Sequence, residues 1–196
     1  MKSYSEACDR NKTPILKVIR SLLENRKEVL EIGSGTGQHA VYFAQQMPHL
    51  VWYTSDRAMN HAAINDWIES AALANVRPPQ LLDVAMEVWP SMTVDVIFSA
   101  NTAHIMSMQE VIELFAGVGR LLLSDGLFLL YGPFNYGNQY SSDSNRLFDQ
   151  RLKMADPLSG IRDFEVLDQL ATQAGMVLLE DYDMPANNRL LCWQKC

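Results

Sequence analysis

The chain has 196 residues, of which 48% are hydrophobic and 20% are charged, a balance typical of one globular domain with a sizeable core. Its formal net charge of -7 argues against a nucleic-acid partner, because proteins that bind nucleic acids usually carry a basic excess. Three cysteines are too few for a disulfide framework, and no apolar run approaches the roughly 20 residues of a membrane span. We therefore expect a cytoplasmic protein with no membrane partner.

The N-terminal part of the chain predicts a polar segment followed by a helix. Residues 1–12 are polar, and Thr13-Pro14 has the form of an N-cap followed by the first helical position. Apolar residues then recur at the spacing of one helical face, namely Ile15, Val18, Ile19, Leu22 and Leu23. Residues 1–27 are therefore expected to form an N-terminal cap and a helix that packs on a sheet.

A glycine-rich turn follows this helix and is central to the prediction. A short apolar strand over residues 28–32 changes abruptly into Gly33-Ser34-Gly35-Thr36-Gly37, and helical spacing continues over 38–47. Strand, glycine turn and helix form the opening unit of a doubly wound α/β domain. Because glycine lacks a Cβ, such a turn can bend sharply and lie directly against a ligand.

Strands and helices continue to alternate along the middle of the chain. A helix is predicted over 59–74, and another starts at Ser107-Met108-Gln109-Glu110, which has capping-box form. Pro78-Pro79 is expected to break the structure before a short third strand, and Asp125-Gly126 to form a turn before the fifth. The four strands of this region are predicted over 50–54, 80–82, 94–99 and 127–131.

A long polar insert at residues 132–162 interrupts this alternation, with only a short helix near 145–154. Such a segment inside a domain is usually functional or mobile. A helix then runs from Phe164 to Gly175, and two final strands, over 176–181 and 190–194, are joined by so short a link that they must pair antiparallel. Residues 1–196 are therefore predicted to form one Rossmann-like, doubly wound α/β domain. It has a mixed seven-stranded sheet with an antiparallel C-terminal hairpin and helices on both faces.

Polar residues gather where the predicted strands end. In a doubly wound sheet, ligands bind at the carboxyl ends of the strands, near the point where the strand order reverses. The residues expected at this edge are Glu31 with the glycines, Asp56, Asp83, Asn101 to His104, and Tyr131.

Two kinds of ligand compete for the glycine turn. A dinucleotide site has the spacing G-x-G-x-x-G, with a pyrophosphate at the helix N-terminus. Here the third glycine, Gly37, falls one residue early and Gln38 takes its place. The G-x-G-x-G spacing suits a nucleoside whose amino-acid portion packs against the turn, and Asp56 is available for the ribose hydroxyls.

These residues resemble the first motif of class I S-adenosylmethionine-dependent methyltransferases, and the closing hairpin is similar to that of the same fold. More narrowly, the chain resembles an uncharacterised methyltransferase-like family, one catalogued as a domain of unknown function. The matching pieces span nearly the whole length: Arg10-Asn11-Lys12, the glycine turn, Ser55-Asp56, Asn101-Thr102-Ala103-His104-Ile105, Tyr131-Gly132-Pro133-Phe134, Ser144-Asn145-Arg146 through Phe148-Asp149, Asp156-Pro157, Gly160-Ile161-Arg162-Asp163-Phe164 and Met184-Pro185-Ala186-Asn187-Asn188.

The resemblance implies S-adenosylmethionine as the cofactor and a role for each strand-end residue. The glycine turn would lie along the methionine portion, with Glu31 fixing the turn and meeting the amino group. Asp56 would hold the ribose, Asp83 and the Val84 backbone the adenine, and Asn101 would lie by the sulfonium. The implied cofactor residues are Glu31, Gly33, Ser34, Gly35, Thr36, Gly37, Asp56, Asp83, Val84 and Asn101. No metal site is predicted.

The residues around the methyl acceptor are less sharply defined by the sequence. If the acceptor must lose a proton, His104 is the first candidate for the base and Tyr131 the second. The polar insert carries arginines and is either a lid over a substrate with a carboxylate or phosphate, or a solvated mobile loop. The candidate substrate residues are Arg10, Asn11, Lys12, Arg146 and Arg151.

The sequence thus favours a methyltransferase that acts on a small molecule by direct in-line transfer to an O, N or S nucleophile. Two alternatives stay open. One is a non-catalytic S-adenosylmethionine-binding scaffold or regulatory protein. The other is an NAD-dependent oxidoreductase, which Gln38 disfavours.

Overall fold

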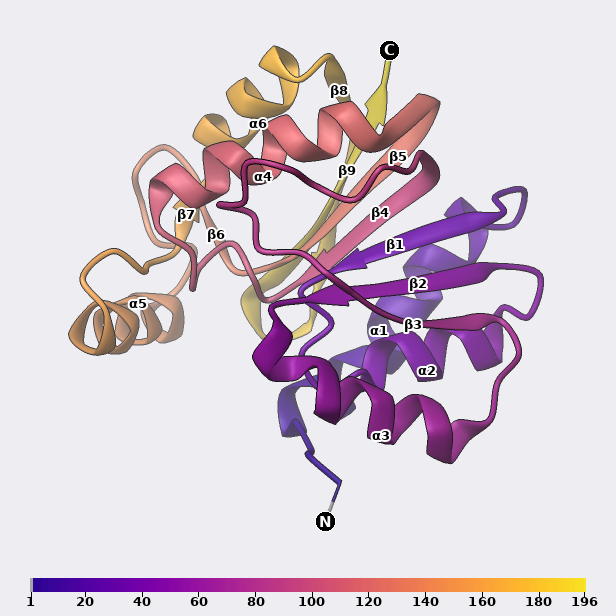
Figure 1. Ribbon diagram of the computed structural model, residues 1–196. Coiled ribbons are helices and arrows are strands. Elements are labelled where there is room, and N and C mark those ends of the chain that lie inside the picture. The colour runs from indigo at the N-terminus through magenta and orange to yellow at the C-terminus, as the bar shows by residue number, and fades with distance from the viewer. Residues whose placement is uncertain (1) are drawn as a thin grey trace.

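The protein is built around one seven-stranded mixed sheet with the strand order β3-β2-β1-β4-β5-β9-β8 (Figure 1). The computed structural model describes residues 2–196. Strand β9 is antiparallel to both β5 and β8, and the other neighbouring pairs are parallel, which confirms the predicted sheet and its C-terminal hairpin. The strands are β1 (Glu28–Ile32), β2 (Val51–Asp56), β3 (Val76–Leu81), β4 (Val94–Ala100), β5 (Leu122–Gly132), β8 (Met176–Met184) and β9 (Asn188–Lys195).

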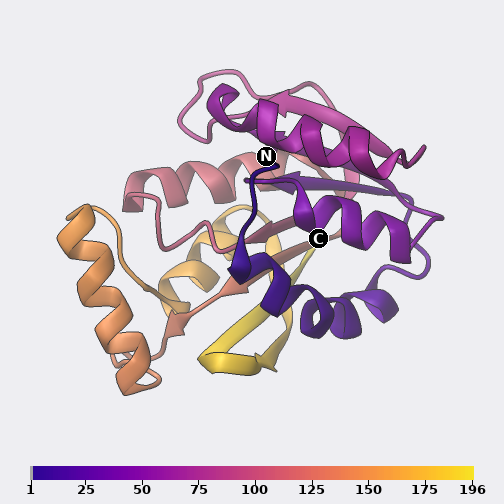
Figure 2. The same cartoon turned by 90° about the horizontal axis from the view of Figure 1, so that it is seen from below.

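Helices cover both faces of this sheet (Figures 1 and 2). On one face, α1 (Glu6–Leu22), α2 (Gln38–Gln46) and α3 (His61–Ala71) pack over a cluster that includes the fully buried Phe43 and Trp52. On the other face, α4 (Met108–Leu121) and α6 (Phe164–Gln173) cover a second cluster. Short 3-10 helices, η1 (Ala58–Asn60) and η2 (Pro185–Asn187), follow β2 and β8. Within residues 2–196, no helix has the length and hydrophobicity needed to cross a bilayer.

Helix α1 begins eight residues before the predicted start at Pro14, so the expected N-cap at Thr13 was wrong. Ser5 is the N-cap, and its hydroxyl accepts a hydrogen bond from the backbone N–H of Cys8 at 3.3 Å. Pro14 lies inside the helix, where a proline removes one backbone hydrogen bond. The early turns are stabilised instead by tertiary contacts, because Asn11 is buried there against α2.

Strand β3 contains both prolines that were expected to precede it. It lies at the edge of the sheet, and its register with β2 shifts between Tyr53 and Ser55, opposite the stretch from Arg77 to Gln80. An edge strand with a bulge tolerates proline because one side of the strand needs no hydrogen-bond donor. The predicted strand over 80–82 was therefore too short, and the preceding helix ends at Ala71 rather than at residue 74.

Strand β5 runs through the turn expected at Asp125-Gly126. Asp125 has a positive φ of 63°, and the parallel register with β4 jumps from Leu122 to Leu127. The Asp-Gly pair thus forms a bulge inside the strand, because the chain continues along β4 on both sides of it. The strand begins five residues earlier than the predicted 127–131.

The polar insert at 132–162 is an ordered extension of the domain, and its helix stands off from the sheet in both ribbon views (Figures 1 and 2). It consists of β6 (Phe134–Asn135), α5 (Asp143–Ala155) and the start of β7 (Arg162–Asp163), and β6 pairs with β7. The buried carboxylate of Asp149 accepts hydrogen bonds from the Tyr140 hydroxyl at 2.7 Å and the Ile161 N–H at 2.8 Å. These bonds fix α5 to the segments on either side of it.

Candidate active site

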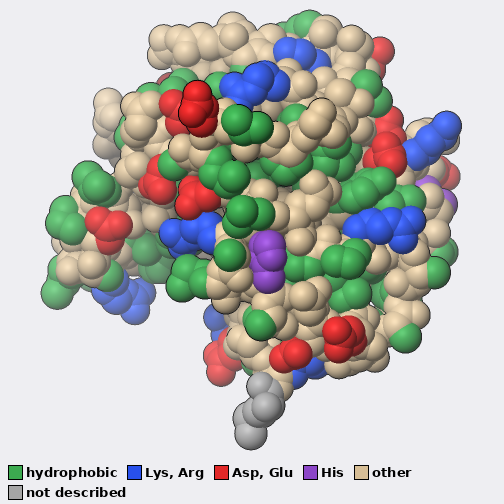
Figure 3. Space-filling model, viewed as in Figure 1, with side chains coloured by type: hydrophobic (Ala, Val, Ile, Leu, Met, Phe, Trp, Pro, Cys, Tyr) green, Lys and Arg blue, Asp and Glu red, His purple; other side chains and the backbone are tan. Residues whose placement is uncertain are grey.

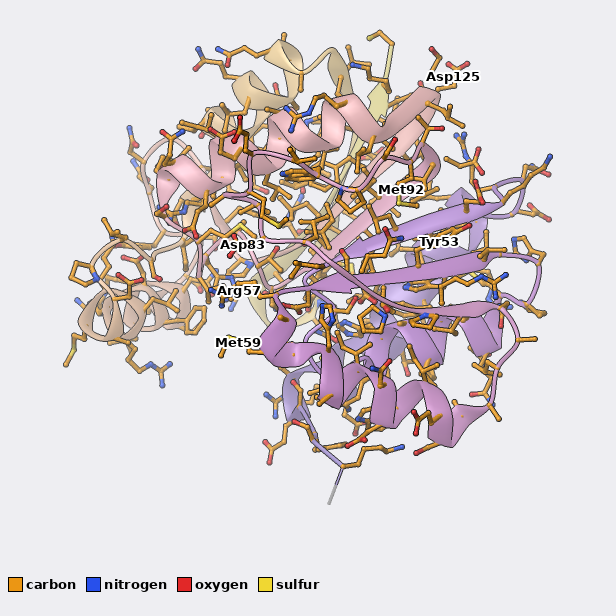
Figure 4. The ribbon with its side chains drawn as sticks, viewed as in Figure 1. Tyr53, Arg57, Met59, Asp83, Met92 and Asp125 are labelled. Carbon is orange, nitrogen blue, oxygen red and sulfur yellow. The ribbon has the colours of Figure 1, made fainter. Side chains whose placement is uncertain are left out.

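A cleft of about 900 Å³ opens at the carboxyl ends of β1, β2 and β4, a size typical of small-molecule sites. In the stick view, Arg57 and Asp83 lie together at this end of the strands (Figure 4). The cleft also extends to the first turns of α1 and to one face of α5. The switch in strand order between β1 and β4 therefore places a cavity where the sequence predicts one.

The glycine turn after β1 needs glycine for two different reasons. Gly33, Gly35 and Gly37 all have positive φ, at 76°, 59° and 86°. A Cβ on Gly33 would lie 2.6 Å from Cγ2 of Thr102, and one on Gly37 would lie 3.1 Å from Cα of Ile64. A Cβ on Gly35 would meet no described atom within 4 Å. Gly35 thus leaves a bare stretch of backbone facing the cleft.

Asp56, the last residue of β2, ties the glycine turn to the segment that follows it. Its Oδ2 accepts a hydrogen bond from the Gly35 N–H at 2.7 Å, and its Oδ1 accepts one from the Asn60 side chain at 2.7 Å. The residue is 8% exposed and lines the cleft. The carboxylate is therefore held in a fixed orientation at the edge of the cavity.

Glu31 lies behind the turn rather than in the cleft. Its Oε2 accepts hydrogen bonds from the Ser34 hydroxyl and the Trp52 indole N–H, both at 3.1 Å. Burial raises the pKa of Glu31 to about 8, so the carboxyl is mostly protonated at neutral pH. Within residues 2–196, neither Glu31 nor Gly37 is among the residues that line the cleft. Glu31 thus contacts the turn through Ser34, and its predicted contact with the amino group of a cofactor stays a prediction.

The other predicted cofactor residues all line the cleft. Asp83 and Val84 follow β3, and Oδ1 of Asp83 accepts a hydrogen bond from the Ala85 N–H at 3.1 Å. Asn101 follows β4 with a positive φ of 60°, and its N–H donates to the Tyr131 carbonyl at 2.8 Å. The cleft is lined in addition by Gly33, Ser34 and Thr36.

The structure separates the two candidate bases. His104 lines the cleft, and burial, with a smaller effect of the Arg162 charge, lowers its pKa to about 4, so the imidazole is neutral at pH 7. Tyr131 is 4% exposed and is not among the lining residues of the described chain. Burial raises the pKa of Tyr131 above its ordinary value. Of these two candidates, only His104 lines the cleft.

Two of the five candidate substrate residues, Arg10 and Arg151, line the cleft. Asn11 is buried, and its Oδ1 accepts a hydrogen bond from Nε2 of His39 at 2.6 Å. Lys12 pairs with Asp9, and Arg146 pairs with Asp143 at 3.5 Å. The structure therefore does not bring Asn11, Lys12 or Arg146 to the cavity wall.

Comparison with known proteins agrees with this architecture. The sequence profile of DUF938, described as a protein of unknown function, matches residues 2–195. The chain belongs to the DUF938 family.

Solved methyltransferase structures share its fold at low sequence identity. An O-methyltransferase family protein from Burkholderia thailandensis superposes with a TM-score of 0.85 and 14% identity, covering 97% of this chain and 57% of that one. The S-adenosylmethionine-dependent methyltransferase SibL, in its apo form, gives 0.81 and 18%, covering 96% and 55%. PigF, solved with SAH, gives 0.80 and 14%, covering 97% and 64%. This DUF938 chain thus has the fold of these proteins and spans 55–64% of their length.

The N-terminal segment of this DUF938 protein is a part of the cleft that the sequence did not indicate. Gln38, at the start of α2, donates from its amide to the Ser5 carbonyl at 3.3 Å and accepts from the Thr36 hydroxyl at 2.9 Å. The Trp67 indole N–H donates to the Ser3 carbonyl at 2.7 Å. Residues 3–5 therefore run from α3 to α1 along the cleft. Their polar, patternless sequence carries no signal of this role.

Proposed function

We propose that this protein is an S-adenosylmethionine-dependent methyltransferase that acts on a small molecule by in-line transfer to an O, N or S nucleophile. One observation carries the proposal: the glycine turn, Asp56 and Asp83 line one continuous cleft at the switch point of the sheet. The methyltransferase fold of the structural neighbours supports it.

The residues of the cleft fit this cofactor in shape and in charge. The exposed backbone at Gly35 suits the methionine portion, and the walls at Asp83 and Val84 suit the adenine. The Asp56 carboxylate has about four lone-pair sites, and three already accept from the Gly35 N–H, the Arg57 N–H and the Asn60 side chain, so one site on Oδ2 remains for a ribose hydroxyl. Acidic and neutral side chains at these positions also match a ligand with a sulfonium and an ammonium.

When bound, the cofactor supplies an electrophilic methyl group. The protein then has to align the nucleophile and exclude water. His104 is neutral, so one ring nitrogen is free to accept a hydrogen bond from the O–H or N–H of an acceptor. A pKa of about 4 makes it a weak base, so its main contribution is orientation of the acceptor.

The dinucleotide alternative is disfavoured by the packing of Gln38. This residue stands where a dinucleotide fingerprint has its third glycine. It is 4% exposed and is hydrogen-bonded to Ser5 and Thr36. A buried side chain therefore occupies the position at which the dinucleotide fingerprint has no side chain.

Calorimetry tests the proposal directly. We expect S-adenosylmethionine and S-adenosylhomocysteine to bind with micromolar affinity and NAD to bind much more weakly. A preference for NAD would contradict the proposal. Turnover across a metabolite panel, followed by formation of S-adenosylhomocysteine, separates an enzyme from a non-catalytic binder.

A further inference from the structure

The cleft is lined by charged groups of both signs. Its acidic residues stand on the side of β2, β3 and α4: Asp56, Asp83 and Glu110. Glu110 belongs to the capping box of α4, where its Oε2 accepts from the Ser107 N–H at 2.6 Å. Arg57 stands next to Asp56 on the same side. The other two arginines of the lining, Arg10 and Arg151, come from α1 and α5.

Arg10 and Arg151 are only weakly engaged by the protein itself. Arg10 pairs with Glu6 at 3.2 Å, but the two side chains are 71% and 81% exposed, and such surface pairs contribute little. The Arg151 side chain makes no hydrogen bond or ion pair with any residue in the range 2–196. Both guanidinium groups are therefore available to a ligand.

The lining near Arg151 includes an aromatic side chain and further apolar surface. Phe148 and Arg151 are three residues apart on α5 and both line the cleft. The Phe148 ring meets the His104 imidazole edge-on, with ring centroids 5.2 Å apart. Pro133 and Ala186 add further apolar surface. This part of the cavity thus offers a flat aromatic contact next to a positive charge that no described residue neutralises.

Helix α5 holds this face in place before any ligand arrives. At its N-terminal end, the Asn145 side chain donates to the Asn187 carbonyl at 3.0 Å. Beyond its C-terminal end, the Gly160 N–H donates to the His104 carbonyl at 2.9 Å, and Arg162 donates to the Ala103 carbonyl at 3.1 Å. A preorganised wall of this kind loses little entropy when it binds a ligand.

We propose that the methyl acceptor is a small anion with an apolar, ring-sized body, whose carboxylate or phosphate is bound by Arg151 and Arg10. This inference rests on the proposed function. Arginine binds either anion through two parallel N–H donors, which gives both affinity and orientation. With its anionic group at the arginines and its body on Phe148, the acceptor presents its nucleophile toward His104 and the cofactor side.

Matched acid and neutral probes test this inference on protein saturated with S-adenosylhomocysteine. Calorimetry compares 4-hydroxybenzoate with 4-hydroxybenzamide, and phenyl phosphate with phenol, so the two pairs also tell a carboxylate site from a phosphate site. We expect one anion to bind at least about tenfold more tightly than its neutral partner. Arg151→Ala and Arg10→Ala should each reduce this preference severalfold, while Lys17→Ala, which removes one charge from the exposed part of α1, leaves it unchanged.

Several outcomes separate failure of this inference from failure of the proposed function. Equal binding of acid and neutral probes, or a preference that survives Arg151→Ala, overturns the anionic acceptor while cofactor binding stands. Absence of S-adenosylhomocysteine binding by the unmodified protein overturns both. Unchanged cofactor affinity in the arginine variants shows that they are folded, so that lost anion preference in them supports the inference.

Discussion

Asp56 combines a structural and a binding role in a single carboxylate. One oxygen holds the Gly35 N–H and the other holds the Asn60 side chain. Oδ1 also accepts from the Arg57 N–H, so the acceptor site that remains is on Oδ2, and Asp56 lines the cleft in which we propose that a ribose binds. Loss of the side chain therefore removes both a ligand contact and the bond that orients the turn.

We expect Asp56→Ala to weaken S-adenosylhomocysteine binding by at least about tenfold, or roughly 1.4 kcal/mol. Asp66→Ala is the matched control, because Asp66 is an exposed acid on α3 outside the cleft lining. Isothermal titration of both variants measures the effect. An Asp56→Ala affinity equal to that of the control would remove Asp56 from the site.

Glu31 predicts a specific pH dependence of stability. Its pKa is raised by burial to about 8 in the folded protein, from a value of 4.5 for the unperturbed group. The folded state therefore retains a proton that the unfolded state loses between these pH values. By linkage, this contribution to the free energy of unfolding is fully present below about pH 4.5 and is lost as the pH rises toward 8.

Glu31→Gln keeps a neutral side chain at every pH, so the variant should lose less stability than the unmodified protein between pH 5 and pH 8. Urea denaturation at several pH values gives the two slopes. Parallel slopes would show that Glu31 does not titrate in this range.

At the scale of elements, the glycines of the five-residue turn have different surroundings: two are packed against neighbouring residues and one leaves open space. Gly33 faces Thr102 and Gly37 faces Ile64, whereas Gly35 faces open space in the described structure. The same substitution at two of these positions should therefore have different consequences.

We expect Gly33→Ala to destabilise the fold by about 2–4 kcal/mol, because a Cβ at 2.6 Å from Thr102 adds a clash to the strain of a positive φ. Gly35→Ala adds only the strain, about 1–2 kcal/mol, but its methyl group projects into the space of the ligand. Gly35→Ala should thus lose more affinity than stability. Thermal unfolding and calorimetry on both variants test the contrast, and equal losses of stability would contradict it.

For the polar insert, the structure distinguishes arginines that the sequence alone could not tell apart. Its arginines resemble one another in sequence, but the helical phase of α5 directs Arg151 to the cleft and leaves Arg146 paired with Asp143. Which arginine meets a substrate depends on how α5 is tied to η2 and to the loop after β4. Those ties join residues more than 40 positions apart.

At the scale of the whole molecule, the face shown in Figure 3 mixes acidic, basic and apolar side chains and has no broad basic patch among the described residues. The negative net charge agrees with this surface. The sequence-based expectation that nucleic acid is not a partner stays a prediction.

Ligand binding at this cleft should stabilise the whole domain by mass action. At a concentration of S-adenosylhomocysteine one hundred times its Kd, we expect about 2.7 kcal/mol of stabilisation and a rise in Tm of roughly 5–10 °C. The same concentration of NAD is the control and should leave Tm nearly unchanged. A larger rise with NAD would favour the dinucleotide alternative. Differential scanning fluorimetry is sufficient for this measurement.

The sequence by itself determined the order of strands and helices, the sheet with its closing hairpin, and the strand ends that carry the candidate site. These features are local: alternation of apolar runs, glycines at a fixed spacing, and the capping box at Ser107, which the structure confirms. The class of fold follows from them because strands and helices that alternate in this way can be connected in only a few topologies.

Only the tertiary structure decided which polar residues face the cavity. Ser5 caps α1 at a point where Gln38 of α2 donates to its carbonyl and where Asn11 is buried against His39, and Pro78-Pro79 fit β3 because it is an edge strand. Glu31 and Tyr131 share strand ends with the cleft residues but lie behind it, and Arg151 reaches it while Arg146 does not. Such choices depend on packing between distant segments, and local sequence patterns do not encode that packing.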